Sequence, residues 1–65
     1  MKLYDKVRLI TDKFMQDGAK NGDIGYIIEI YEDGNCEVEF SDSKTGISYA
    51  QIVVEQKDLE SAEND

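Results

Sequence analysis

The chain has 65 residues, of which 15 are acidic and 7 basic, and it carries a formal charge of −8 at pH 7. A chain this short buries only about 60% of the surface that its unfolded form exposes, so it builds one small core. Histidine is absent and cysteine occurs once, which excludes an internal disulfide, a zinc cluster and the usual Ser-His and Cys-His nucleophile pairs. We therefore expect no enzymatic activity, no metal and no cofactor.

The first predicted strand covers residues 2–10. Apolar and polar side chains alternate there, with Val7 and Leu9 on the predicted core side and Lys6 and Arg8 on the other. Residues 11–23 contain two glycines and several charged groups, which predicts a long loop with room for one short helical turn.

The second predicted strand covers residues 24–31, which are rich in isoleucine and tyrosine. Gly22 and Gly25 near its start allow a sharp turn and a close approach of neighbouring backbone. Residues 32–35 form a predicted turn. The third strand, residues 36–42, alternates between small or apolar residues and the outward Glu37 and Glu39.

Residues 47–54 form the fourth predicted strand, and a change of parity between Tyr49 and Ile52 indicates a bulge. Residues 55–59 predict one tight helical turn that places Leu59 in the core. We expect the chain to fray from Glu60 onward, and we assign residues 1–60 to a single domain and 61–65 to an acidic C-terminal tail. The pattern predicts an all-β fold, a small SH3-like barrel of four to five strongly bent antiparallel strands with one short helical turn near the C-terminus.

The charge and hydropathy of the chain restrict its partners. No stretch approaches the roughly 20 apolar residues that span a bilayer, and the N-terminal residues are charged throughout, so we expect a cytoplasmic protein. Residues 1–28 hold five basic and four acidic side chains, whereas residues 29–65 hold two basic and eleven acidic ones. Such a charge is repelled by lipid and nucleic-acid phosphates, and it favours a basic protein partner.

The length of the second hairpin loop determines which residues face one another. A two-residue loop would set Ile30 beside Glu37 and bury a glutamate. A three-residue loop, residues 33–35, avoids this and predicts the pairs Ile30–Val38 and Ile28–Phe40 on the core side and Glu29–Glu39 and Tyr31–Glu37 on the outer side. Opposed glutamates cost about 0.2–1 kcal/mol relative to neutral neighbours.

Two interpretations of this acidic surface remain open. Arg8 or Lys6 of the first strand could lie beside Glu29 and cancel the repulsion within the chain. Alternatively, the repulsion is relieved when a cationic partner docks, and a tyrosine among the acids supplies an interface anchor. The candidate partner-binding residues are Glu29, Tyr31, Glu32, Asp33, Glu37, Glu39 and Asp42. Acids nearer the C-terminus could carry the contacts instead, namely Glu55, Asp58, Glu60, Glu63 and Asp65.

The sequence also resembles a known family. The segments Leu3–Leu9 (LYDKVRL), Gly22–Gly25 (GDIG) and Val38–Phe40 (VEF) resemble the L-Y-D-x-V-x-L, G-D-x-G and V-E-F motifs of a small bacterial family of domains of unknown function. The resemblance covers about residues 3–60. It implies an SH3-like barrel akin to KOW modules. It also implies an antitoxin or immunity role, because family members often lie beside candidate toxin genes. The chain lacks the prolines that the family commonly has in the first loop and near the last turn.

Together these observations predict an immunity protein or antitoxin that binds a basic, nuclease-type toxin and occludes its cationic cleft, as a monomer or a heterodimer with the toxin. An SH3-like accessory module that docks on a larger assembly is the alternative. A nucleic-acid-binding role is disfavoured by the eleven acids in residues 29–65.

Overall fold

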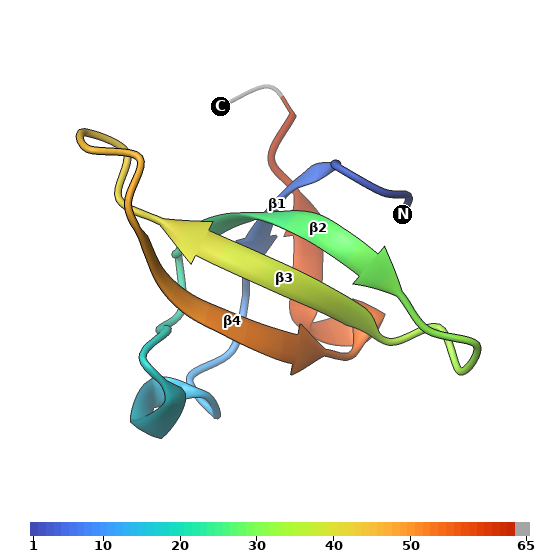
Figure 1. Ribbon diagram of the computed structural model, residues 1–65. Helices are drawn as coiled ribbons and strands as arrows, with labels where there is room; N and C mark the ends of the chain where they lie inside the picture. Colours follow the sequence, from blue (N-terminus) through green and yellow to red (C-terminus); the bar gives the residue numbers. More distant parts are fainter. Residues whose placement is uncertain (64–65) are drawn as a thin grey trace.

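Five antiparallel strands form one sheet in the order β4-β3-β2-β1-β5 (Figure 1). The computed structural model describes residues 1–63. Its elements are β1 (Lys6–Leu9), the 3₁₀ turn η1 (Met15–Asp17), β2 (Ile24–Ile30), β3 (Cys36–Ser41), β4 (Ser48–Val54), the 3₁₀ turn η2 (Gln56–Asp58) and β5 (Leu59–Ser61). Figure 1 shows β1 and β5 running behind β2 and β3, so the sheet is strongly bent. The predicted all-β class is confirmed.

The core lies on the inner side of this bend. Alternation in each strand sends one set of side chains inward, as expected for a sheet with one covered face. The largest fully buried side chains are Val7, Leu9, Ile27, Cys36, Val38, Phe40 and Val54. Burial raises the pKa of the Cys36 thiol, which fits its role as a small core residue.

Gly25 allows β2 to cross closely over β3. A β-carbon at this position would lie 2.7 Å from both the carbonyl oxygen of Glu39 and Cγ1 of Val38. No side chain fits in that space, so the predicted close approach of backbone near the second strand is confirmed at Gly25.

The predicted register of the β2–β3 hairpin is wrong. Ile30 pairs with Cys36 and Glu29 with Glu37, and a β-bulge follows, beyond which Ile27 pairs with Val38. The loop consists of residues 32–34, between the paired Tyr31 and Asn35, and not of residues 33–35, so the pairs next to the loop already differ from the prediction. The bulge changes which isoleucine enters the core, because Ile27 is fully buried whereas Ile28 is only partly so.

The fourth strand has a bulge, as predicted, but it lies at Tyr49 and not between Tyr49 and Ile52. The β3–β4 register shifts between Phe40 and Ser41, so that Phe40 pairs with Ala50 and Ser41 with Ser48. Tyr49 lies in this bulge, and its ring packs at 6.5 Å from the ring of Phe40.

The two ends of the chain differ from expectation. The first strand begins at Lys6 and not near residue 2, because Tyr4 adopts a positive φ of 70° that interrupts an extended run. The expected fraying from Glu60 is not seen, since β5 continues to Ser61 and Ala62 is buried with its N–H donating to the carbonyl of Lys6 at 2.9 Å. Asp65, part of the predicted tail, lies outside the described residues. Residues 1–63 contain no helix of the length and apolarity needed to span a bilayer.

Candidate functional site

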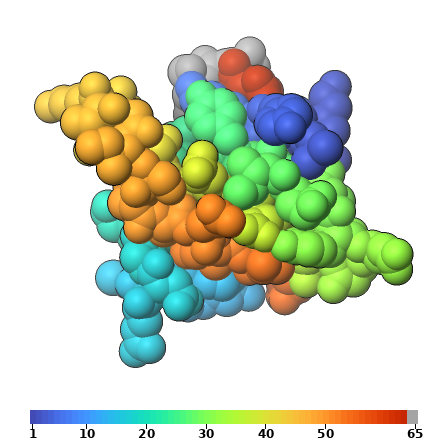
Figure 2. Space-filling view, viewed as in Figure 1, coloured from blue at the N-terminus to red at the C-terminus, as the bar shows by residue number. Residues whose placement is uncertain are grey.

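The side of β2, β3 and β4 that faces away from the core carries acids, tyrosines and a valine. Cross-strand pairing sets Glu29, Glu37 and Val53 in one row and Tyr26, Glu39 and Gln51 in the next. These six residues, with Tyr31 just beyond the end of β2, are called the outer face below. Figure 2 looks onto it, with β3 (yellow) as a narrow strip between β2 (green) and β4 (orange).

Glu37 lies at the centre of the outer face and is held from both sides. The Tyr31 hydroxyl donates a hydrogen bond to Oε1 of Glu37, and the Gln51 side-chain amide donates one to Oε2. Both bonds favour the ionised carboxylate, and they lower the pKa of Glu37 below its usual value. The hydrogen bond to Glu37 also raises the pKa of Tyr31. Glu37 is therefore a fixed, ionised carboxylate in a defined orientation.

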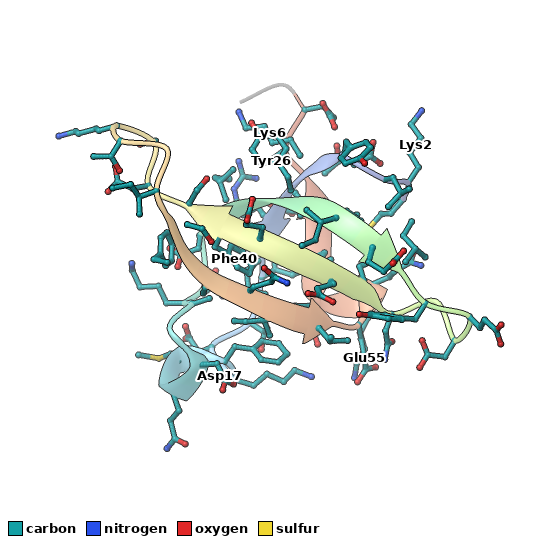
Figure 3. The ribbon with its side chains drawn as sticks, viewed as in Figure 1. Lys2, Lys6, Asp17, Tyr26, Phe40 and Glu55 are labelled. Carbon is teal, nitrogen blue, oxygen red and sulfur yellow. The ribbon has the colours of Figure 1, made fainter. Side chains whose placement is uncertain are left out.

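The acids of the outer face are not neutralised by cations of the described chain. Arg8, a candidate for this role, pairs with Glu60 at 2.6 Å. Lys6 lies across from Tyr26, not from Glu29, and Figure 3 shows the two labelled side by side. Among residues 1–63, none of the ion pairs within 4.0 Å involves Glu29, Glu37 or Glu39. The like-charge pair Glu29–Glu37 therefore persists, although the sequence predicted Glu29–Glu39.

The structure brings four of the seven predicted partner-binding residues together, namely Glu29, Tyr31, Glu37 and Glu39. Glu32 and Asp33 lie in the adjoining β2–β3 turn, where an Asp33 carboxylate oxygen accepts the N–H of Asn35 at 2.9 Å. Asp42 lies in the loop at the opposite end of β3.

Asp42 organises its own loop. One carboxylate oxygen accepts the N–H groups of Lys44 at 2.8 Å and Thr45 at 3.0 Å. These bonds lower the pKa of Asp42, as is usual for a carboxylate that caps a turn. Asp42 therefore has a structural role in its own loop, away from Glu29, Tyr31 and Glu37.

The acids near the C-terminus are also engaged within the chain. Asp58 pairs with Lys13 at 2.7 Å, Glu60 with Arg8, and Glu55 with Lys57 at 3.9 Å. Glu63 accepts the backbone N–H of Lys6 at 2.8 Å. These contacts give the described C-terminal acids structural roles, which favours the outer face as the binding surface.

The sequence-based set omitted Tyr26, Gln51 and Val53. Tyr26 and Val53 are 44% and 47% exposed, so the outer face presents apolar as well as acidic surface. The alternation of side chains along β4 places Gln51 and Val53 on the same side of the sheet as Glu37 and Glu39. Identifying them as neighbours of these glutamates also requires the β3–β4 register.

A separate pocket lies where the first loop meets β4. It has a volume of about 350 Å³ and is lined by Met15, Gly18, Ala19, Lys20, Asp23 and Tyr49. Burial, together with a hydrogen bond to Asp23, raises the pKa of Tyr49 to about 12, so this hydroxyl stays protonated at neutral pH. Asp23 is also paired with Lys20 at 3.4 Å.

Within residues 1–63, no group of three or more Asp, Glu or Cys side chains is placed to hold a metal ion.

These features define a small all-β domain with an acidic and aromatic sheet surface. The chain belongs to the family described as Domain of unknown function (DUF4926), whose family model matches residues 3–61. This confirms the resemblance to a small family of domains of unknown function. No curated protein matches the chain, and no solved structure does.

Proposed function

We propose that this domain binds a basic protein through its outer face, and that it acts as an immunity protein or antitoxin for a nuclease-type toxin. The main support for this proposal is Glu37, whose carboxylate is held by hydrogen bonds from two neutral donors, while no cation within residues 1–63 pairs with it.

Preorganised charge favours association with a cation. The orientation of Glu37 is already fixed by Tyr31 and Gln51, so a partner's Lys or Arg meets an acceptor whose side-chain entropy is largely lost before binding. Binding also relieves the repulsion between Glu29 and Glu37. Charge complementarity of this kind raises the association rate and selects basic partners.

The proposed mechanism is occlusion. A nuclease cleft is lined with cations that hold phosphates, and carboxylates spaced along β3 offer negative charge to the same groups. Glu37 and Glu39 lie two residues apart on one strand, so their side chains project to the same side. The exposed rings of Tyr26 and Tyr31 flank them and supply apolar contact.

The exposed apolar side chains also favour a second candidate. Tyr26, Tyr31 and Val53 are each more than 40% exposed, which fits an accessory module that docks on a larger assembly with little dependence on charge. The two functions differ in how binding responds to salt.

Co-expression with the product of the adjacent gene tests the proposal. We expect the wild-type chain to be recovered in complex with that product and to rescue growth. The double variant Glu37→Lys/Glu39→Lys should lose both, whereas the charge-matched control Glu55→Lys/Glu63→Lys should retain them. Rescue and recovery by the Glu37/Glu39 variant, with loss in the control, would move the site away from the outer face. An adjacent product that neither binds nor inhibits growth would contradict the antitoxin role.

A further inference from the structure

Strand β4 is an open edge of the sheet. It pairs with β3 on one side, and among residues 1–63 it has no sheet neighbour on the other. An edge of this kind presents unpaired N–H and C=O groups to any chain that can pair with them. The pattern of backbone hydrogen bonds identifies which groups these are.

The alternation of hydrogen-bonded and non-hydrogen-bonded residue pairs can be followed outward from the β2–β3 hairpin. Tyr31 donates its N–H to the carbonyl of Asn35 at 2.9 Å, so this pair is hydrogen-bonded. Hydrogen-bonded and non-hydrogen-bonded pairs alternate along an antiparallel ladder. Two residues further along, the Glu29–Glu37 pair is therefore hydrogen-bonded as well, and the peptide groups of Glu37 point toward β2.

The same alternation then applies to β4. Because the peptide groups of Glu37 point to β2, those of Val38 point to β4, where its partner is Ile52. The peptide groups of Gln51 and Val53, on either side of Ile52, consequently point away from β3. Within residues 1–63 these groups form no hydrogen bond outside the sheet.

The open part of the edge has definite limits. At its start the first loop comes close, since a β-carbon on Gly18 would lie 3.7 Å from the carbonyl oxygen of Tyr49. Beyond that point, Gln51 and Val53 are exposed on the outer face and Ile52 and Val54 are buried on the core side. The edge available for pairing is therefore Gln51–Val54.

The bulge at Tyr49 and the first loop protect the start of this edge, but Gln51–Val54 carries no charge or proline that would prevent strand pairing. Natural edges are often protected by lysine, proline or inward-pointing charge. Residues 45–54 contain no charged residue and no proline, and they form the longest uncharged run in a chain that is 34% charged. A neutral strip of this length on a chain of charge −8 restricts the partner that fits it.

We propose that Gln51–Val54 pairs antiparallel with the same edge of a second copy of this chain. A two-fold symmetric contact places each surface patch against itself, so an acidic patch would repel its own copy. The β4 edge can meet itself without opposing like charges. An uncharged edge offers no electrostatic attraction to a strand of a basic partner. Two copies of this acidic chain, by contrast, can pair only where like charges do not oppose one another.

The register of the pairing follows from the free groups. Gln51 of one copy opposes Val53 of the other and the reverse, and each of these two pairs exchanges two backbone hydrogen bonds. Ile52 then lies on the symmetry axis. The outer-face glutamates on β3 and on its symmetry mate then lie three strand spacings or about 14 Å apart. That distance exceeds the screening length of about 8 Å at 0.15 M salt. Glu55 of each copy lies opposite the neutral Tyr49 of the other.

The dimer predicted in this way is weak and depends on salt. So short a contact falls below the roughly 1,200 Å² that stable complexes bury, so we expect a dissociation constant on the order of 100 µM. Added salt should strengthen it, because salt screens the repulsion between two chains of charge −8. Binding of a cationic partner by the outer face should weaken with salt, so the two interactions are distinguishable, and this inference does not rest on the proposed function.

Sedimentation equilibrium of the full 65-residue chain tests the inference. Between about 10 µM and 1 mM protein in 0.5 M NaCl, the mean mass should rise from 7.4 kDa toward twice that value, and it should rise less in low salt. Val53→Pro removes a free N–H without removing a β3–β4 bond, and it should stay monomeric while its circular dichroism remains native. The matched control Val53→Thr keeps the N–H and should dimerise like the wild type.

A second measurement does not depend on the proline variant folding. In the wild type, concentration should shift the amide resonances of Gln51 and Val53 and leave those of Tyr31 and Glu37 in place. A chain that stays monomeric at 1 mM in 0.5 M NaCl would overturn the inference. So would undiminished association of a folded Val53→Pro, shifts centred on Tyr31 and Glu37, or an edge that pairs only with a strand of a different, basic protein.

Discussion

At the scale of single residues, Glu37 shows how a charge can be fixed without being neutralised. Its neighbours Tyr31 and Gln51 are neutral donors, so they orient the carboxylate and stabilise its ionised form while leaving the net charge at −1. A lysine in either place would orient the group equally well but would cancel its field. The choice of neutral donors is what keeps the outer face electronegative.

Replacing Tyr31 by phenylalanine should raise the pKa of Glu37. The hydroxyl of Tyr31 is the largest cause of the lowered pKa, and phenylalanine removes it while keeping the ring. Carboxyl-carbon NMR titration of Glu37 measures the change, with Tyr4→Phe, at a ring 74% exposed, as the control. A depressed folded-state pKa stabilises the fold above the unfolded value, and this contribution is lost as the pH falls through the folded value. An unchanged pKa in Tyr31→Phe would contradict the role given to the hydroxyl.

Gly25→Ala should destabilise the domain by about 1–3 kcal/mol, the usual cost of overpacking. The added methyl would meet the Glu39 carbonyl oxygen at 2.7 Å, and backbone cannot move aside as a flexible side chain would. Urea denaturation followed by circular dichroism gives the free energy of unfolding. Wild-type stability in this variant would show that β2 and β3 are less closely apposed than described.

At the scale of elements, the alternation of side chains was enough to predict the strands and most of the core. Val7, Leu9, Val38 and Phe40 all point inward as predicted. The hairpin register was predicted wrongly because the loop lies one residue earlier than expected, between the paired Tyr31 and Asn35. A bulge at Ile28, which no local residue pattern marks, then shifts the pairs beyond it once more. Gln51 and Val53 were missed as members of the candidate site because their place depends on the β3–β4 register, which was not predicted. Lys6 and Arg8 both point outward as predicted, but the partner of Arg8 is Glu60 of β5, which the sequence did not predict as a strand.

The long first loop is tied to the second 3₁₀ turn by one ion pair. Lys13 lies 2.7 Å from Asp58, and this contact raises the pKa of Lys13. Ile10 also donates its N–H to the carbonyl of Asp58 at 2.9 Å. Ile10 and Lys13, near the start of the first loop, thus both contact Asp58 of η2, which lies far from them in sequence.

Asp58→Asn should lower the thermal unfolding midpoint of the domain. It removes the charge that Lys13 faces, whereas Glu55→Gln, beside the longer 3.9 Å contact to Lys57, should change it little. The raised pKa of Lys13 means that this stabilisation is complete below the unfolded lysine pKa and is lost as the pH rises through the folded one. Differential scanning calorimetry at pH 7 and pH 11 measures both effects. Equal unfolding midpoints for Asp58→Asn and the wild type at pH 7 would show that the Lys13–Asp58 ion pair does not stabilise the fold.

At the scale of the whole molecule, net charge acts on every other property. The described chain measures 32 × 25 × 17 Å, while the screening length is about 30 Å at 0.01 M salt and about 8 Å at 0.15 M. At low salt each acid therefore repels nearly every other one. The five-stranded sheet folds in spite of this repulsion.

Added salt should stabilise the isolated domain. The thermal midpoint of the wild type should rise between 0.01 M and 0.5 M NaCl, because screening removes self-repulsion of the −8 charge in the compact state. The increase should be smaller in Glu29→Gln/Glu37→Gln, which removes the directly opposed pair. A midpoint that falls with salt would mean that internal ion pairs outweigh the repulsion.

The most direct test of the proposed docking surface is the salt dependence of binding to the adjacent gene's product, measured by isothermal titration calorimetry. We predict that the affinity of the wild type falls as salt rises, and that Glu37→Gln/Glu39→Gln both weakens binding and flattens this dependence. Glu55→Gln/Glu63→Gln, with the same change of charge away from the outer face, should follow the wild type. Identical affinities and identical salt dependences for the two double variants would contradict the claim that the outer face binds a cationic partner.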